Sequence, residues 1–119
     1  MPGANAILIE PPDFSAVWMI GAHGAISHYD RSGGWTAQPS GVEADLTAGS
    51  APSVRVCWAV GRSGTIVRTV DGAHWEKIAS PVGSDLTGIA AANASEATIT
   101  AAGGDRYATS DGGRNWRPL

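Results

Sequence analysis

Short runs of β-branched, aromatic and other apolar residues alternate with clusters rich in glycine and proline along the whole chain. Short runs bounded by turn-forming residues are typical of β-strands. Four runs follow one another in the middle of the chain, and a comparable set lies on either side. The expected strands are 5–10, 16–20, 25–29 and 35–38, then 45–50, 55–60, 65–69 and 75–78, and finally 85–91, 97–101, 106–110 and 115–117. The pattern predicts an all-β protein.

The spacing of tryptophan and glycine reveals an internal repeat of about 40 residues. Residues 88–97 are rich in alanine, which favours a helix by propensity alone, but their place in the repeat predicts strands. We expect three copies of one unit, at about 1–40, 41–80 and 81–119, in a single domain. Four strands in a unit of this length are typical of a β-propeller blade. Equivalent positions are Trp18 and Trp58; Gly24, Gly64 and Gly104; Trp35, Trp75 and Trp116; and the Asp-Leu-Thr triplets that begin at Asp45 and Asp85.

Residues 109–116, Thr-Ser-Asp-Gly-Gly-Arg-Asn-Trp, resemble the Asp-box, or bacterial neuraminidase repeat, of β-propellers. Residues 69–75 resemble a version one residue shorter, and residues 28–35 keep the aspartate-to-tryptophan spacing without the Ser/Thr. Residues 58–69 are similar to blades of the photosystem II assembly-factor propellers. The resemblance implies turns between third and fourth strands that have a structural role, on the face away from any ligand site.

Three blades do not close a ring, because propellers carry about 4–8 blades. A stack of repeats leaves apolar faces at both ends unless they are capped, so we expect both outer faces to seek partners. The favoured arrangement is a homodimer in which two chains form one six-bladed ring. The alternative is that the chain is a fragment of a longer propeller.

Charge and composition exclude several other classes of function. The formal net charge is −3 and is spread without blocks, which argues against nucleic-acid binding. The single cysteine, Cys57, excludes an internal disulfide and a cysteine-rich zinc site, and the three histidines are scattered. We expect no metal and no cofactor. Without a secretory signal or an apolar stretch of the ~20 residues that cross a bilayer, we expect no membrane partner, and a cytoplasmic location or a place in a larger bacterial protein.

Function in a propeller usually lies at one mouth of the central channel, where the loops between blades meet the loops between second and third strands. The innermost strand of each unit opens on a polar residue, which in a six-bladed dimer gives a rim of aspartates and asparagines. The candidate catalytic residues are Asp45, Asp85 and Glu43, and the candidate ligand-binding residues are Asn5, His23, Arg62, Asp105 and Arg106.

Two classes of function fit this rim. The first is a non-catalytic module that holds a glycan, a small molecule or a protein segment at the channel mouth. The alternative is a small glycoside hydrolase, since paired carboxylates can divide the roles of acid and base or nucleophile. Asp45 and Asp85 also suit a purely structural role as caps of turns, and no sialidase-like arginine cluster is recognisable.

Overall fold

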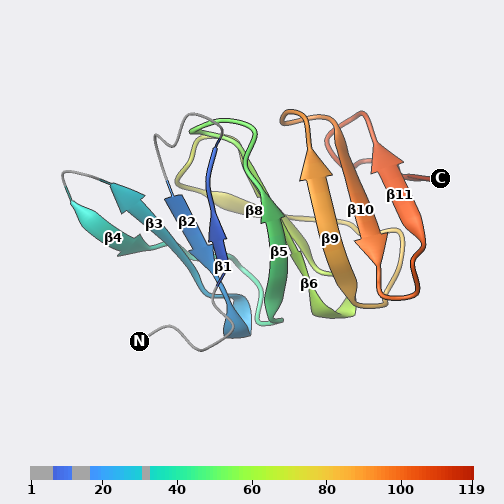
Figure 1. Ribbon diagram of the computed structural model, residues 1–119, viewed down its shortest axis with the longest axis horizontal. Coiled ribbons are helices and arrows are strands. Elements are labelled where there is room, and N and C mark those ends of the chain that lie inside the picture. The colour runs from blue at the N-terminus through green and yellow to red at the C-terminus, as the bar shows by residue number, and fades with distance from the viewer. Residues whose placement is uncertain (1–6, 12–16, 31–32) are drawn as a thin grey trace.

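The computed structural model describes residues 7–11, 17–30 and 33–119. The described strands form three antiparallel four-stranded sheets, each made of strands consecutive in the chain (Figure 1). We call them blades 1, 2 and 3. Blade 1 consists of β1 (Ile7–Ile9), β2 (Val17–Ile20), β3 (Ile26–Asp30) and β4 (Gly34–Ala37); blade 2 of β5 (Leu46–Ser50), β6 (Cys57–Gly61), β7 (Ile66–Thr69) and β8 (Trp75–Ile78); blade 3 of β9 (Leu86–Ala91), β10 (Ala97–Ala101), β11 (Arg106–Thr109) and β12 (Arg117–Pro118).

The observed strands follow the repeat that the sequence predicts, including its alanine-rich part. This part contributes the end of β9 and the start of β10 rather than a helix. Two strands begin two residues later than expected: β6 begins at Cys57 instead of residue 55, and β12 begins at Arg117 instead of residue 115. Asn115 belongs to the preceding turn, where its backbone N–H and its side-chain amide both donate to Asp111.

The inner strands β1, β5 and β9 lie next to one another, and each blade is built outward from its inner strand (Figure 1). A backbone hydrogen bond of 3.0 Å from Leu46 N to Gly21 O joins the start of β5 to blade 1. The rim loops η1 (Ala22–Gly24) and η2 (Arg62–Gly64) connect the second and third strands of blades 1 and 2. They therefore lie at the same end of the sheets as the starts of the inner strands.

The hydrophobic core consists of two apolar clusters, one between each pair of neighbouring blades. Trp18 and Ile20 of blade 1 pack with Cys57 and Ala59 of blade 2 in the first cluster. The second cluster repeats this arrangement one blade further along, with Trp58 and Val60 of blade 2 against Leu86, Ala97 and Ile99 of blade 3. Because each sheet hides its apolar face only by packing on the next, the blades stabilise one another.

Indole N–H groups add polar links between blades. Trp75 Nε1 donates to Gln38 Oε1 at 2.8 Å, and Trp116 Nε1 donates to Ala79 O at 3.0 Å. The buried Trp58 donates through Nε1 to Asn93 O at 3.1 Å and meets Trp116 edge to face. Trp58, Trp75 and Trp116, three of the tryptophans that mark the repeat, therefore link neighbouring blades.

Candidate functional site

The rim loops contain residues with left-handed backbone conformation. His23 and Ser63 have φ of 58° and 59°, and each is followed by a glycine with φ near 70°. Non-glycine residues rarely adopt this conformation, so each loop needs support. The glycine-rich sequence at 61–65 forms the tight turn that joins β6 to the antiparallel β7.

Asp45 and Asp85 supply that support across the blade boundaries. Asp45 Oδ1 accepts a 3.0 Å hydrogen bond from His23 N, and Asp85 Oδ1 accepts a 2.9 Å bond from Ser63 N. In both cases the aspartate opens the inner strand of one blade while the amide belongs to the rim loop of the preceding blade. Each carboxylate therefore links two neighbouring blades through an equivalent hydrogen bond, as the repeat would require. We call these two hydrogen bonds the latches.

A pocket with a volume of about 290 Å³ opens beside the first of these latches. We call it the rim pocket. Arg62 Nε lies 3.6 Å from Asp45 Oδ2, and both side chains remain exposed to solvent. Thr47 Oγ1 donates to Leu86 O at 2.8 Å, which ties the pocket to blade 3. The pocket is lined by Ile7, Ala22, Asp45, Thr47 and Arg62.

The structure brings together only part of the set of residues that the sequence predicts. Asp45 and Arg62 meet in the rim pocket, next to the His23 amide. Asp85 forms its latch one blade further along. Asn5 lies outside the described residues. Glu43, Asp105 and Arg106 are exposed, on the segment between blades 1 and 2, before β11 and at the start of β11 respectively.

Sequence reasoning missed the apolar and neutral side of the rim pocket. Ile7, Ala22 and Thr47 have no chemical signature of their own, although the repeat places Ala22 at the position equivalent to Arg62. Aligning the rim loops position by position would have identified Ala22 as the counterpart of Arg62.

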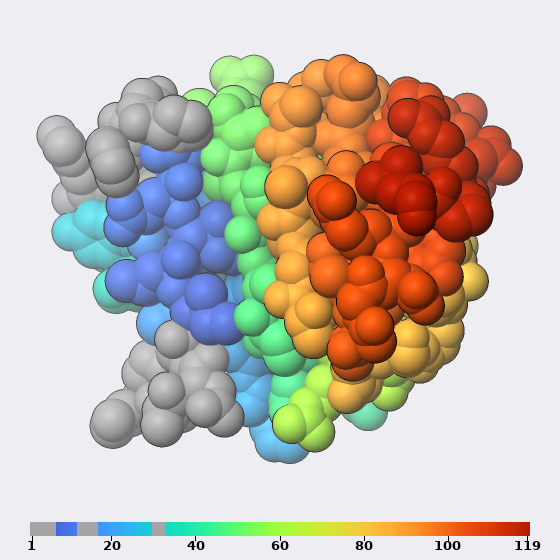
Figure 2. Space-filling model, turned by 45° about the vertical axis from the view of Figure 1, so that its right-hand side comes forward, coloured from blue at the N-terminus to red at the C-terminus, as the bar shows by residue number. Residues whose placement is uncertain are grey.

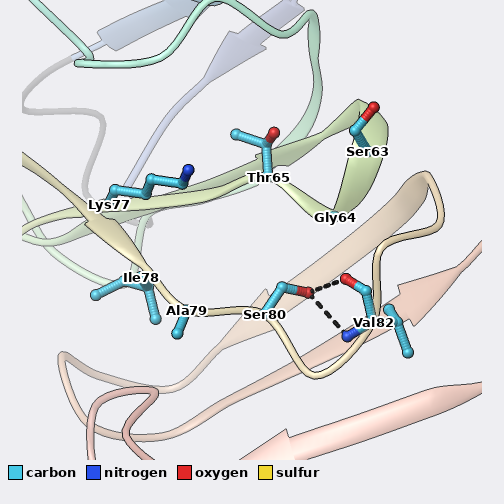
Figure 3. A pocket seen from close by; sticks show the side chains of 8 residues that line it. All are labelled: Ser63, Gly64, Thr65, Lys77, Ile78, Ala79, Ser80 and Val82. Atoms are coloured by element: carbon cyan, nitrogen blue, oxygen red, sulfur yellow. Dashed lines mark hydrogen bonds between the residues drawn. The ribbon is translucent and has the colours of Figure 1, made fainter.

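A second pocket of about 500 Å³ lies between the η2 loop, the end of β8 and the link to blade 3 (Figure 3). Lys77 and Ser63 are its exposed polar residues, and Ile78 is apolar. Ser80 Oγ donates to Val82 O at 2.8 Å and accepts from Val82 N at 3.3 Å, which shapes the link. No motif in the sequence marks Lys77, because the pocket combines segments of three different elements.

The turns at Asp71 and Asp111 join the third and fourth strands of blades 2 and 3, at the end of the sheets opposite the rim loops. Asp71 Oδ1 accepts from His74 N at 2.8 Å and from Ala73 N at 2.9 Å. These bonds hold the pKa of Asp71 well below its usual range. Hydrogen bonds from Asn115, first from its backbone amide, lower the pKa of Asp111 to about 2. Both carboxylates therefore accept hydrogen bonds within their own turns.

The described part of the chain forms neither a metal site nor a reactive thiol. Across residues 7–11, 17–30 and 33–119, no group of three or more His, Cys, Asp or Glu side chains is placed to hold a metal ion. Burial raises the pKa of the Cys57 thiol, which keeps it protonated and unreactive. Among the same residues, no helix has the length and apolar character needed to cross a membrane.

No protein-family model and no curated protein matches this chain. Solved structures do match it, among them two of YCF48. One is described as YCF48 bound to D1 peptide, with a TM-score of 0.76 and 20% sequence identity over 100% of this chain. The other, YCF48 from Cyanidioschyzon merolae, has a TM-score of 0.76 and 21% identity over 97% of this chain.

The chain has a β-propeller fold. YCF48 is a propeller of the photosystem II assembly-factor type, to which the sequence analysis compares the blades. This chain covers 44% and 37% of the two YCF48 chains, so its three blades correspond to less than half of either molecule.

Proposed function

We propose that this chain is a β-propeller binding module that holds an extended protein segment at the channel mouth. The observation that carries the proposal is the rim pocket, where the exposed Arg62–Asp45 pair lies beside the apolar side chain of Ile7. The pocket opens at the starts of the inner strands, where ligands of propellers usually bind.

The chemistry of the rim pocket suits a peptide. A guanidinium carries five N–H donors, so Arg62 has donors left for backbone carbonyls or a carboxylate after its contact with Asp45. Ile7 and Ala22 provide apolar surface for a side chain. Pockets that combine apolar surface with a few fixed polar groups are typical of specific binding sites.

A similar fold supports the same kind of ligand. YCF48 has been solved bound to D1 peptide, which shows that a propeller of this shape accommodates a protein segment. Function does not follow from fold alone, so the proposal depends on the rim pocket and uses the likeness as support.

We assign the turns at Asp71 and Asp111 to the Asp-box motif, with a structural role. The carboxylates bind their own turns at the end of the blades away from the rim pocket. The assignment explains why the motif recurs in this chain without a catalytic set around it.

The glycoside hydrolase remains the alternative, with Asp45, Asp85 and Glu43 as its carboxylates. The latches favour binding over hydrolysis, because one oxygen of Asp45 and one of Asp85 each bind a backbone amide. A panel of chromogenic glycosides tests the alternative. Turnover that is lost in Asp45→Asn and Asp85→Asn would support hydrolysis, whereas the proposal predicts no turnover on any member of the panel.

An array of synthetic extended peptides tests the proposed binding. Arg62→Ala is the informative variant, because the equivalent positions of blades 1 and 3 are Ala22 and Ala102 and the loop accepts alanine there. We expect it to weaken binding of selected peptides at least tenfold, about the loss of one charge-assisted hydrogen bond.

Arg55→Ala is the matched control. Arg55 is an exposed arginine in the loop between β5 and β6, at the opposite end of blade 2, and the substitution changes the net charge equally. Equal losses in both variants would mean that charge alone attracts the peptides, and retained binding in Arg62→Ala would contradict the proposed site. The same variants on a glycan array separate a peptide ligand from a carbohydrate.

A further inference from the structure

Asp85 borders the rim pocket on the side of blade 3. Thr47, which lines the pocket, donates from Oγ1 to Leu86 O at 2.8 Å, so the residue after Asp85 is bonded to the pocket wall. Asp85 Oδ1 accepts from the backbone amide of Ser63, the residue next to Arg62. The inner strands β5 and β9, green and orange in Figure 2, lie side by side on the face shown. A segment that leaves the rim pocket toward blade 3 therefore passes Asp85.

The two aspartates of the latches have different neighbours. Arg62 N donates to Asp45 O at 3.0 Å, and one blade further along Ala102 N donates to Asp85 O at 2.8 Å, so Arg62 and Ala102 are equivalent. Arg62 also reaches Asp45 Oδ2 with its guanidinium, whereas Ala102 has no charge to offer Asp85. The ion pairs of the described residues do not include Asp85. Its carboxylate is thus an exposed negative charge that no described cation balances.

The other charged side chains at this end of blades 2 and 3 leave Asp85 unbalanced. Arg106 alternates with the core positions of blade 3, so its side chain points away from blade 2, whereas the amide bound by Asp85 belongs to blade 2. Lys77 lies on β8, the outermost strand of blade 2. Glu43 and Asp105 add negative charge on either side.

We propose that Asp85 selects segments that carry a lysine or arginine, and that it binds this side chain while another part of the segment occupies the rim pocket. The inference rests on the proposed function of the pocket and names the class of segment. An ionised carboxylate that accepts one N–H has further lone pairs for an ammonium or guanidinium group. Packed sheets lie ~10 Å apart and an extended chain advances ~3.3 Å per residue. The basic residue is therefore expected about three residues from the side chain that enters the pocket.

Paired synthetic peptides test the inference. Each extended peptide is made in two forms, with lysine or with glutamine at the third residue from an apolar one, and its dissociation constant is measured by fluorescence anisotropy. We expect the wild-type chain to bind the lysine form about three to five times more tightly than the glutamine form, which is the contribution of one exposed ion pair.

Asp85→Asn is the informative variant, because it removes the charge and keeps an oxygen that accepts from Ser63 N. We expect the ratio of the two dissociation constants to fall to about one, with an unchanged circular dichroism spectrum. Glu96→Gln is the matched control and keeps the wild-type ratio. Glu96 Oε1 accepts from Asn93 Nδ2 at 2.9 Å in the turn between β9 and β10, at the opposite end of blade 3, and the substitution changes the net charge equally.

The outcomes separate this inference from the proposed function. A wild-type ratio near one, with binding that Arg62→Ala still weakens, would overturn the role of Asp85 and retain the rim pocket as the peptide site. A lysine preference that persists in Asp85→Asn, or that Glu96→Gln reduces as strongly, would also overturn this role, because the preference would then come from other acids or from net charge. Absence of binding by either form of every peptide would overturn the proposed function and this inference together.

Discussion

At the scale of single residues, four aspartates of this chain have two distinct structural tasks. Asp45 and Asp85 bind amides of the preceding blade, whereas Asp71 and Asp111 bind amides of their own turns. The sequence predicts the structural role of the second pair through the motif. For the first pair it leaves capping and catalysis open, because a carboxylate at a loop looks the same in both cases until its partner is known.

The Asp111 turn predicts a pH dependence of stability. The pKa of Asp111 falls from an ordinary value of 3.8 to about 2 in the folded chain. A lowered pKa gives stability that is fully present above the unfolded pKa and is lost as pH falls through the folded one. We expect the melting temperature of the wild type to fall between about pH 4 and pH 2 more steeply than that of Asp111→Asn, measured by thermal denaturation. Parallel curves would contradict this role of the carboxylate.

Gly64 is a residue whose conformation the fold requires. It has φ of +71°, and a Cβ there would collide with the backbone carbonyl of Val82 in the link to blade 3. Gly64→Ala is expected to lower the free energy of unfolding by about 2 kcal/mol or more, measured in urea.

Gly83→Ala in the same link is the control. A Cβ at Gly83 has no neighbouring atom within 4 Å, so the expected change is within about 0.5 kcal/mol. Equal losses in the two variants would mean that the contact with Val82 is unimportant.

At the scale of elements, the repeat period predicted most strands, because equivalent residues recur where each blade needs them. It overrode helix propensity around β9 and β10, where packing on blade 2 decides the structure. The error at β12 has a local cause that a period cannot reveal, since Asn115 is held by Asp111. The rim pocket was predicted in part. The charges of Asp45 and Arg62 made these residues candidates from the sequence, whereas Ile7 and Thr47 line the pocket only because the blades pack side by side.

Trp58 tests the packing between elements. Trp58→Phe removes the hydrogen bond to Asn93 and reduces the aromatic surface under the Arg68 guanidinium, which lies 5.3 Å from the Trp58 ring centroid. We expect a loss of about 1–3 kcal/mol in the free energy of unfolding. Trp35→Phe, at an exposed position of blade 1, is expected to change it by less than about 0.5 kcal/mol. Similar losses in the free energy of unfolding for the two variants would mean that Trp58 at the blade boundary stabilises the fold no more than the exposed Trp35 does.

At the scale of the whole molecule, the faces of the three blades differ. The sequence analysis expects apolar outer faces because it treats the three copies as equivalent. The copies are not equivalent face by face: Thr98 and Thr100 occupy the positions at which blade 2 buries Trp58 and Val60. Only the strand register shows which side of the sheet these residues cover.

The central claim is that a protein segment binds at the rim pocket. Amide chemical shifts of the wild-type chain during titration with a peptide selected on the array test it most directly. The account predicts saturable shifts concentrated at residues 22–24, 45–47 and 62–64. Shifts concentrated at the Asp71 and Asp111 turns, or no saturable shifts with any selected peptide, would contradict it.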